Sequence, residues 1–295
     1  MEAQEWHILT SGYRPEDLAV KVHPQLSDFP SASPADARRW QLVHDVTYRV
    51  DRRHFWHVVR NERIFKMLRW AVPNLKEKSY LEIGCGVGNV LGYLFDHGVS
   101  NCVGWDINNY SLEIARRRYP HAKFFERDFL RPSDSNELFD VTGMFDVLEH
   151  FPDDVAILKS VKSLLKPGGT VVLTVPAHSV LWSAYDDFFG HYRRYDKHQL
   201  LNVLQRAGFI NPRALYMMAS LAPVLWLSRQ RLSGKSLSDC DLEQSFERES
   251  SLPNPLLNEI AKSVLRMEHA LLGRNDLSFG AALVATASRP HSEAL

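Results

Sequence analysis

The chain has few cysteines, and their spacing excludes the usual cysteine-based sites. Cys85, Cys102 and Cys240 are the only three among 295 residues, and an odd number without paired spacing argues against both a zinc site and a disulfide framework. We expect structural thiols in a reducing compartment, which favours a cytoplasmic location. The N-terminus is acidic and polar rather than basic and then apolar, so no signal peptide is predicted.

Net charge and long apolar runs are also lacking. Lys plus Arg and Asp plus Glu both number 35, so no overall basic field attracts nucleic acid, and a nucleic-acid partner is not expected. The longest apolar stretch, residues 214–227, is interrupted by Ser220 and Pro223 and is shorter than the ~20 residues that span a bilayer. No transmembrane segment is predicted, while peripheral contact with a membrane stays open.

What the sequence does contain is a regular alternation of short apolar runs and amphipathic segments. This alternation predicts an α/β fold, a doubly wound Rossmann-like sheet of seven mostly parallel strands. The expected strands are residues 79–83, 101–106, 122–126, 139–145, 169–175, 213–218 and 281–287. The expected helices of the core are residues 89–96, 110–119, 154–165 and 199–207.

The flanking segments predict additions to this core. We expect an N-terminal arm and helical cap at 1–75, the core at 76–218, a helical insertion that covers the acceptor at 219–276, and the last strand and tail at 277–295. The predicted buried stripe of the cap comprises Phe55, Val58, Val59, Glu62, Phe65 and Leu68. A segment rich in Ser, Asp and Glu, residues 233–251, is expected to be a mobile linker.

A glycine loop follows the first strand. Gly84, Gly86 and Gly88 form a G-x-G-x-G pattern rather than the dinucleotide G-x-G-x-x-G, and Glu82 precedes them. An acid at this place would repel a pyrophosphate but suits a cationic amine. The loop therefore favours the methionine end of S-adenosylmethionine (AdoMet) over NAD.

Acids at the next strand ends complete the expected cofactor site. Asp106 lies about 20 residues beyond the glycine loop, where a carboxylate can accept two hydrogen bonds from a ribose diol, although it could also cap the following helix. Asp128 is expected to accept from the adenine amino group while Phe129 covers the ring. Ile107 and Phe145 belong to the same predicted site.

Taken in order, these motifs resemble the class I AdoMet-dependent methyltransferases, in the branch with ubiquinone-type and many small-molecule enzymes. The resemblance covers roughly residues 78–210. It implies methyl transfer to an oxygen or nitrogen of a small molecule, with lipid-, quinone- and sugar-like acceptors all open. The Asn/Asp-Pro-Pro-Tyr/Phe run of nucleic-acid methylases is lacking after residue 145.

A narrower resemblance is to bacterial type 11 or 12 methyltransferases. It rests on His54-Phe55-Trp56 with Arg60, and on Leu181-Trp182-Ser183 with Asp186 and the run from Gly190 to Tyr195. An arginine can pair bidentately with the methionine carboxylate of AdoMet. Arg60 is expected in that role, with Trp56 stacking nearby.

The candidate catalytic residues follow the fourth and fifth strands. His191 is the expected general base, since an ordinary histidine pKa near 6.5 suits proton transfer at neutral pH; the alternative is a structural partner of Asp186. Glu149 and His150 are expected to shape the pocket floor or to assist, and a divalent metal with Asp146 is an alternative, although no metal is included in the predicted cofactors. The predicted acceptor contacts are Trp182, Asp186, Tyr192, Arg194 and Tyr195.

Two rival functions stay open at this point. One is an NAD-type oxidoreductase on the same fold, which the glycine spacing and Glu82 disfavour. The other is a methyltransferase-like protein that binds AdoMet without turnover. Neither rival would form a methylated product, so an assay for that product separates both from the methyltransferase hypothesis.

Overall fold

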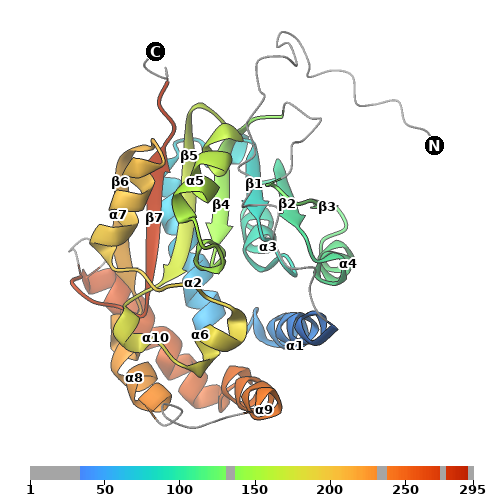
Figure 1. Ribbon diagram of the computed structural model, residues 1–295, viewed down its shortest axis with the longest axis vertical. Helices are drawn as coiled ribbons and strands as arrows, with labels where there is room; N and C mark the ends of the chain where they lie inside the picture. The colour runs from blue at the N-terminus through green and yellow to red at the C-terminus, as the bar shows by residue number, and fades with distance from the viewer. Residues whose placement is uncertain (1–33, 131–136, 231–237, 273–276, 292–295) are drawn as a thin grey trace.

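A single sheet organises the chain. The computed structural model describes residues 34–130, 137–230, 238–272 and 277–291, so the surface arm expected before residue 34 lies outside them. The strand order is β3-β2-β1-β4-β5-β7-β6 (Figure 1). The strands are β1 Tyr80–Ile83, β2 Cys102–Asp106, β3 Lys123–Glu126, β4 Phe139–Phe145, β5 Leu165–Pro176, β6 Ile210–Met217 and β7 Ala282–Ser288.

The sheet is mostly parallel, as the alternating pattern predicts. Strands β1 to β5 pair in parallel, and only β7 runs antiparallel to its neighbours β5 and β6. The predicted seven-stranded Rossmann-like fold is therefore confirmed. Strand order reverses between β1 and β4, and ligands of open α/β sheets bind outside the carboxyl ends of the strands at such a point.

Helices cover both faces of the sheet. The core helices are α3 Asn89–Asp96, α4 Asn109–Arg118, α5 Asp154–Ser163 and α7 Lys197–Arg206. Alternate side chains of β5 show the two layers, because Val172 packs in the core with α3 and α4 whereas Val171 and Leu173 pack in the core with α5 and α7. Burial on both faces explains why the strands read as nearly continuous apolar runs.

Two helices precede the sheet, and they have different roles. Helix α2 (Phe55–Ala71) contacts β5, β7 and α3, whereas α1 (Pro34–Val50) contacts α4 and α9. The predicted buried stripe of α2 was mostly wrong, since only Val59 and Leu68 are buried and its other four members, Phe55, Val58, Glu62 and Phe65, are half-buried. Its buried residues are Val59, Arg60, Asn61, Ile64, Met67 and Leu68. The face is rotated because Arg60 and Asn61 turn inward to buried polar partners.

The predicted helical insertion before the last strand is present. It comprises the short turn η6 Ala219–Leu221, α8 Ala222–Gln230, α9 Asp239–Ser250 and α10 Pro255–Leu272. The expected linker at 233–251 is wrong for 239–250, because Ser238 and Asp241 form a reciprocal capping box that starts α9. Residues 231–237 lie outside the described part. None of the described helices is long and apolar enough to cross a membrane.

Candidate functional site

The glycine loop joins β1 to α3 in left-handed backbone. Gly84, Gly86 and Gly88 have φ of 69°, 51° and 75°, a region that other L-residues rarely adopt. A Cβ added to Gly84 would lie 2.6 Å from Val147, whereas one on Gly86 would meet only the ring of His44, 3.6 Å away. The backbone of Gly86 thus faces a space that α1 bounds.

Asp106 ends β2 directly beside this loop. Its carboxylate accepts hydrogen bonds from the backbone N–H of Gly86 at 2.7 Å and of Asn108 at 2.8 Å. Burial raises the pKa of Asp106, although those hydrogen bonds oppose the shift. The alternative role as N-cap of α4 belongs instead to Asn108, whose side chain accepts from Ser111 N–H. Asp106 therefore braces the loop at the position predicted for a ribose ligand.

Glu82 is a buried acid behind the loop. It is 3% exposed, and its Oε2 has no hydrogen-bond partner among the described residues. Burial raises its pKa to about 8, against the opposing charge of Arg60. A buried carboxylate without a partner is costly, and a cationic amine would relieve that cost. The buried acid is compatible with the ammonium group of AdoMet, and this contact stays a prediction.

Arg60 has a protein partner that the sequence did not reveal. Its guanidinium lies 2.6 Å from Oδ2 of Asp146 and also donates to Oγ1 of Thr174. Thr174 Oγ1 donates to Asp146 Oδ1 at 2.9 Å, and Asp146 is held at φ 55°. Because the carboxylate of Asp146 already pairs with Arg60, the contact of Arg60 with the methionine carboxylate of AdoMet stays a prediction. Trp56, the expected neighbour, is half-buried against the core of α2 and α3.

The residues predicted at the adenine end lie on three strand ends. Ile107 follows β2 and is 57% exposed, so its side chain is available to a ligand. Asp128 accepts from Leu130 N–H, and Phe129 packs edge-on against Phe151 with ring centroids 5.9 Å apart. Phe145 is buried in the core under Arg60. Phe145 supports the site from within the core.

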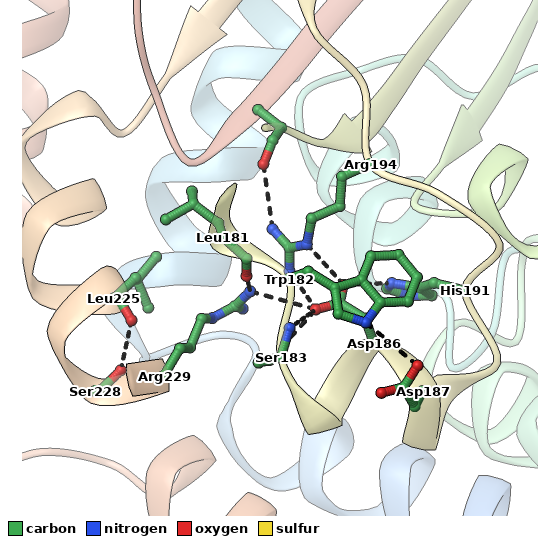
Figure 2. Close-up of polar contacts among 11 residues, drawn as sticks. Leu181, Trp182, Ser183, Asp186, Asp187, His191, Arg194, Leu225, Ser228 and Arg229 are labelled. Carbon is green, nitrogen blue, oxygen red and sulfur yellow. Dashed lines mark hydrogen bonds and ion pairs between the residues drawn. The ribbon is translucent and has the colours of Figure 1, made fainter. Parts of the chain in front are cut away.

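A buried carboxylate organises the segment after β5. Asp186 lies on α6 (Ala184–Phe189), is 1% exposed, and is surrounded by donors that define the Asp186 cluster (Figure 2). Arg194 donates to both oxygens at 2.8 and 3.0 Å. The other members are Ser183, His191 and Arg229. The prediction that Asp186 and Arg194 bind the acceptor is therefore wrong, because each satisfies the charge of the other.

His191 uses one ring nitrogen in this cluster. Nδ1 lies 2.9 Å from Oδ1 of Asp186. Burial would raise the pKa of Asp186, but the hydrogen bond from His191 and the charge of Arg194 outweigh burial and hold it at about 2. Asp186 thus orients the ring of His191 through Nδ1, and the role of His191 as general base stays a prediction.

The remaining predicted acceptor contacts divide into buried and exposed side chains. Tyr195 is 2% exposed, packs in the core with α5 and α7, and donates to Asp154, so its predicted contact with an acceptor is wrong. Tyr192 is 59% exposed. Trp182 is half-buried and donates to Asp187 at 3.3 Å (Figure 2). Only Tyr192 and Trp182 stay predicted acceptor contacts.

Glu149 and His150 lie on the short turn η4 (Leu148–His150), next to His191. One ligand atom from each of these three residues lies within 4.8 Å of the others. Glu149 is fully buried, and neither carboxyl oxygen has a partner in the described part of the chain. Burial, reinforced by Asp146, raises the pKa of Glu149, and burial lowers that of His150 to about 4. The donor types suit a divalent cation, while a neutral acid beside a neutral imidazole is the metal-free alternative.

Helix α1 adds two residues that were not predicted. The ring of Trp40 lies 6.0 Å from that of His44 and 5.7 Å from that of His150, between centroids. His44 is the residue that faces Gly86, and burial lowers its pKa. The i, i+4 spacing of Trp40 and His44 places both on one helix face. This spacing could have shown that Trp40 and His44 share a helix face, but it could not show which part of the sheet that face of α1 contacts.

Comparison with known proteins agrees with this geometry. A family model described as a methyltransferase domain matches residues 48–211. A ubiquinone biosynthesis O-methyltransferase of Actinobacillus pleuropneumoniae is 31% identical over 103 residues, which are 32% of this chain and 44% of that protein. A demethylmenaquinone methyltransferase of Chlorobaculum tepidum is 26% identical over 152 residues, 50% of this chain and 60% of that protein. The chain thus spans about half the length of these curated relatives.

Solved structures share the fold at low identity. Phosphoethanolamine N-methyltransferase 2 of Haemonchus contortus, in complex with AdoMet, gives a TM-score of 0.53 at 18% identity and covers 78% of this chain and 52% of that one. The [4+2]-cyclase SpnF gives 0.50 at 14% identity, over 78% and 82%. The family match is the more specific result because it spans more than half of the chain. The chain therefore belongs to the methyltransferase domain family, and the class I AdoMet-dependent type that its motifs predict is confirmed.

Proposed function

We propose that this protein transfers a methyl group from AdoMet to an oxygen of a small acceptor with an acidic hydroxyl, of the phenol or quinol type. The observation that carries the proposal is the bond between His191 and Asp186, which leaves a basic nitrogen beside the carboxyl edge of the sheet. The name of the ubiquinone biosynthesis relative, an O-methyltransferase, supports oxygen as the acceptor atom over nitrogen. Lipid-linked and sugar-bearing phenols belong to the same chemical class.

In this proposal, residues at the ends of three strands, β1, β2 and β3, would hold the donor. Asp106 would accept hydrogen bonds from the ribose, Glu82 would pair with the ammonium group, and Asp128 with Phe129 would contact the adenine. The backbone at Gly86 allows close approach because it carries no Cβ. Bound AdoMet supplies an electrophilic methyl group on a sulfonium, which becomes a neutral thioether after transfer.

His191 completes the reaction from the acceptor side. Its Nε2 would take the proton that the acceptor hydroxyl loses as its oxygen gains the methyl group. Asp186 fixes the tautomer and stabilises the imidazolium that results. Glu149 and His150 line the same space, and their burial excludes water that would otherwise compete with the acceptor. The chain therefore contributes mainly positioning, proton transfer and exclusion of water.

The comparisons disfavour one of the two rival functions but not the other. Family membership disfavours the NAD-type oxidoreductase, in agreement with the glycine spacing. A protein that binds AdoMet without turnover keeps its place as a rival, and the cyclase SpnF shows that the fold itself does not prescribe methyl transfer. Turnover must therefore be measured directly.

The test is transfer of labelled methyl from AdoMet to a panel of catechols, quinols and glycosylated phenols. We expect a labelled product with at least one phenolic acceptor and none when its hydroxyl is replaced by hydrogen. Calorimetry with AdoMet and NAD separates the donor classes. Parallel assays with chelator and with added Mg²⁺ or Zn²⁺ decide whether Glu149, His150 and His191 hold a metal. AdoMet binding without any product would favour the non-catalytic rival.

A further inference from the structure

Helix α1 crosses the carboxyl edge of β1 and β2 as a separate element (Figure 1). Its first half is fixed to α6, where Arg39 donates to the carbonyl of Phe188 at 2.8 Å. Its second half is fixed to α4, where Asp45 accepts from the hydroxyl of Tyr110 at 2.6 Å. The helix is thus fastened on both sides of the proposed donor site, by one partly buried and one exposed hydrogen bond.

A row of four rings runs along the inner side of this helix. His44 lies over Gly86, Trp40 follows at 6.0 Å, His150 at 5.7 Å from Trp40, and His191 at 4.8 Å from His150, all between ring centroids. The row therefore leads from the glycine loop, at the donor end, to the proposed base, at the acceptor end. Trp40 is the ring between the two ends.

The sulfonium must lie between those ends for the methyl group to reach the acceptor. A sulfonium is a cation, and an indole ring attracts cations at its face more strongly than other aromatic side chains do. We propose that Trp40 covers the sulfonium of bound AdoMet, and that α1 is a lid that closes over the donor and carries this residue. The inference rests on the proposed function, because it assumes AdoMet in the site.

The packing of the lid gives a reason for its movement. His44 lies against Gly86, in the space that the donor would use, so α1 has to withdraw before AdoMet enters. Residues 51–54 join α1 to α2, and the buried ion pair between Asp51 and Arg118, at 2.8 Å, anchors this end of the lid. The bond of Arg49 to Glu247 is exposed on both sides and contributes little to holding the helix down. Binding energy from the donor can then hold the lid closed.

The test compares the affinities of AdoMet and S-adenosylhomocysteine, which lacks the positive charge, by calorimetry. Trp40→Leu keeps an apolar side chain but removes the ring, so we expect the AdoMet dissociation constant to rise about tenfold and that of S-adenosylhomocysteine by less than about threefold. Trp40→Phe should restore most of the difference. Trp70→Leu is the matched control, since Trp70 is 57% exposed on α2 and should change neither affinity.

A second measurement reports the lid itself. Trypsin cleavage at Arg38, Arg39 and Arg49 should slow when AdoMet is added to the wild-type protein, and slow less in Trp40→Leu. Equal losses of affinity for both ligands, or no loss for either, would overturn the role of Trp40 while leaving the proposed function intact. A wild-type protein that binds neither ligand would overturn both.

Discussion

Nδ1 of His191 and Oδ1 of Asp186 lie 2.9 Å apart. Asp186 lies in α6, and His191 follows the end of that helix, five residues further along the chain. The same carboxylate pairs with Arg194, so Asp186 is both ionised and immobile. This arrangement separates two roles that the sequence could not separate. Asp186 and Arg194 form a buried ion pair with each other, and His191 joins them through Nδ1 alone among the contacts of the described residues.

Replacing His191 is expected to separate binding from chemistry. His191→Ala should lower turnover by ~10²–10⁴ fold, the range for losing a general base, while the AdoMet dissociation constant stays close to the wild-type value. Calorimetry and initial rates on one preparation measure both quantities.

The exposed His198 of α7 gives the matched control for this experiment. His198→Ala should keep full turnover and stability. If His191→Ala is stable and turns over normally, the proton goes to water or to another residue, with Glu149 and His150 as the next candidates.

Arg194 is expected to matter for stability rather than for the acceptor. Arg194→Met leaves the buried Asp186 charge without its main partner, and breaking a buried pair in this way costs about 3–5 kcal/mol of unfolding free energy. Denaturant unfolding measures the loss. Arg117→Met, which breaks an exposed pair with Glu113, should change stability little. A stable Arg194→Met protein with a raised KM for acidic acceptors would instead support the original substrate role.

Glu82 is expected to make AdoMet binding depend on pH. Its pKa of about 8 leaves it protonated at pH 6, whereas pairing with an ammonium group needs the carboxylate, so binding must release a proton. Affinity should therefore increase by up to about tenfold per unit between pH 6 and 7.5. Calorimetry in buffers of different ionisation enthalpy counts the proton, and Glu82→Gln should abolish the release.

The same shift has an opposite effect on the ligand-free protein. The unfolded chain loses the Glu82 proton at ordinary carboxyl pH while the folded chain keeps it, so stability should fall as pH rises toward 8. Thermal unfolding measures this slope. Glu82→Gln should reduce it without removing it, because the pKa of Glu149 is raised in the same direction. A slope unchanged by the substitution would mean that Glu82 is ionised in the folded protein.

Asp106 is expected to be the strongest single contributor to donor affinity. Two ribose hydrogen bonds to a charged acceptor are worth roughly 1.5–3 kcal/mol each. Asp106→Ala also removes the hydrogen bond that the carboxylate accepts from Gly86 N–H. Calorimetry should show a large rise in the AdoMet dissociation constant. The control is Asp140→Asn, which lies at the opposite edge of the sheet beside Ser79 and Lys166. An unchanged affinity in Asp106→Ala would remove this residue from the site.

Much of the fold could be predicted because its signals are local. An apolar run followed by Gly84, Gly86 and Gly88 specifies a strand, a tight turn and a helix start within a few residues. The strand β4 and the helix α3 were predicted to the residue for the same reason. The insertion was harder, since the polar composition of residues 239–250 favours a linker and only the capping box at Ser238 signals a helix.

The site was predictable only where one strand end supplies the residue. Asp106 and Glu82 follow from position along a strand, and the structure finds both beside the glycine loop. The partners of Arg60 and Arg194 could not be predicted, because a buried guanidinium takes whichever carboxylate the fold brings to it, and those carboxylates lie on separate elements. Tyr195 was predicted to contact the acceptor because the sequence does not show that it packs in the core with α5 and α7.

By itself, the sequence determined the parallel sheet, the glycine loop and the acids that face it, because backbone conformation and apolar periodicity are set by neighbours in the chain. The tertiary structure alone decided that α1 crosses the strand ends and that Trp40 stands between His44 and His150. It also decided which charged residues are paired and which are free. The physical reason is that burying a charge or a ring has a free energy that depends on what surrounds it, and the surroundings come from distant parts of the chain.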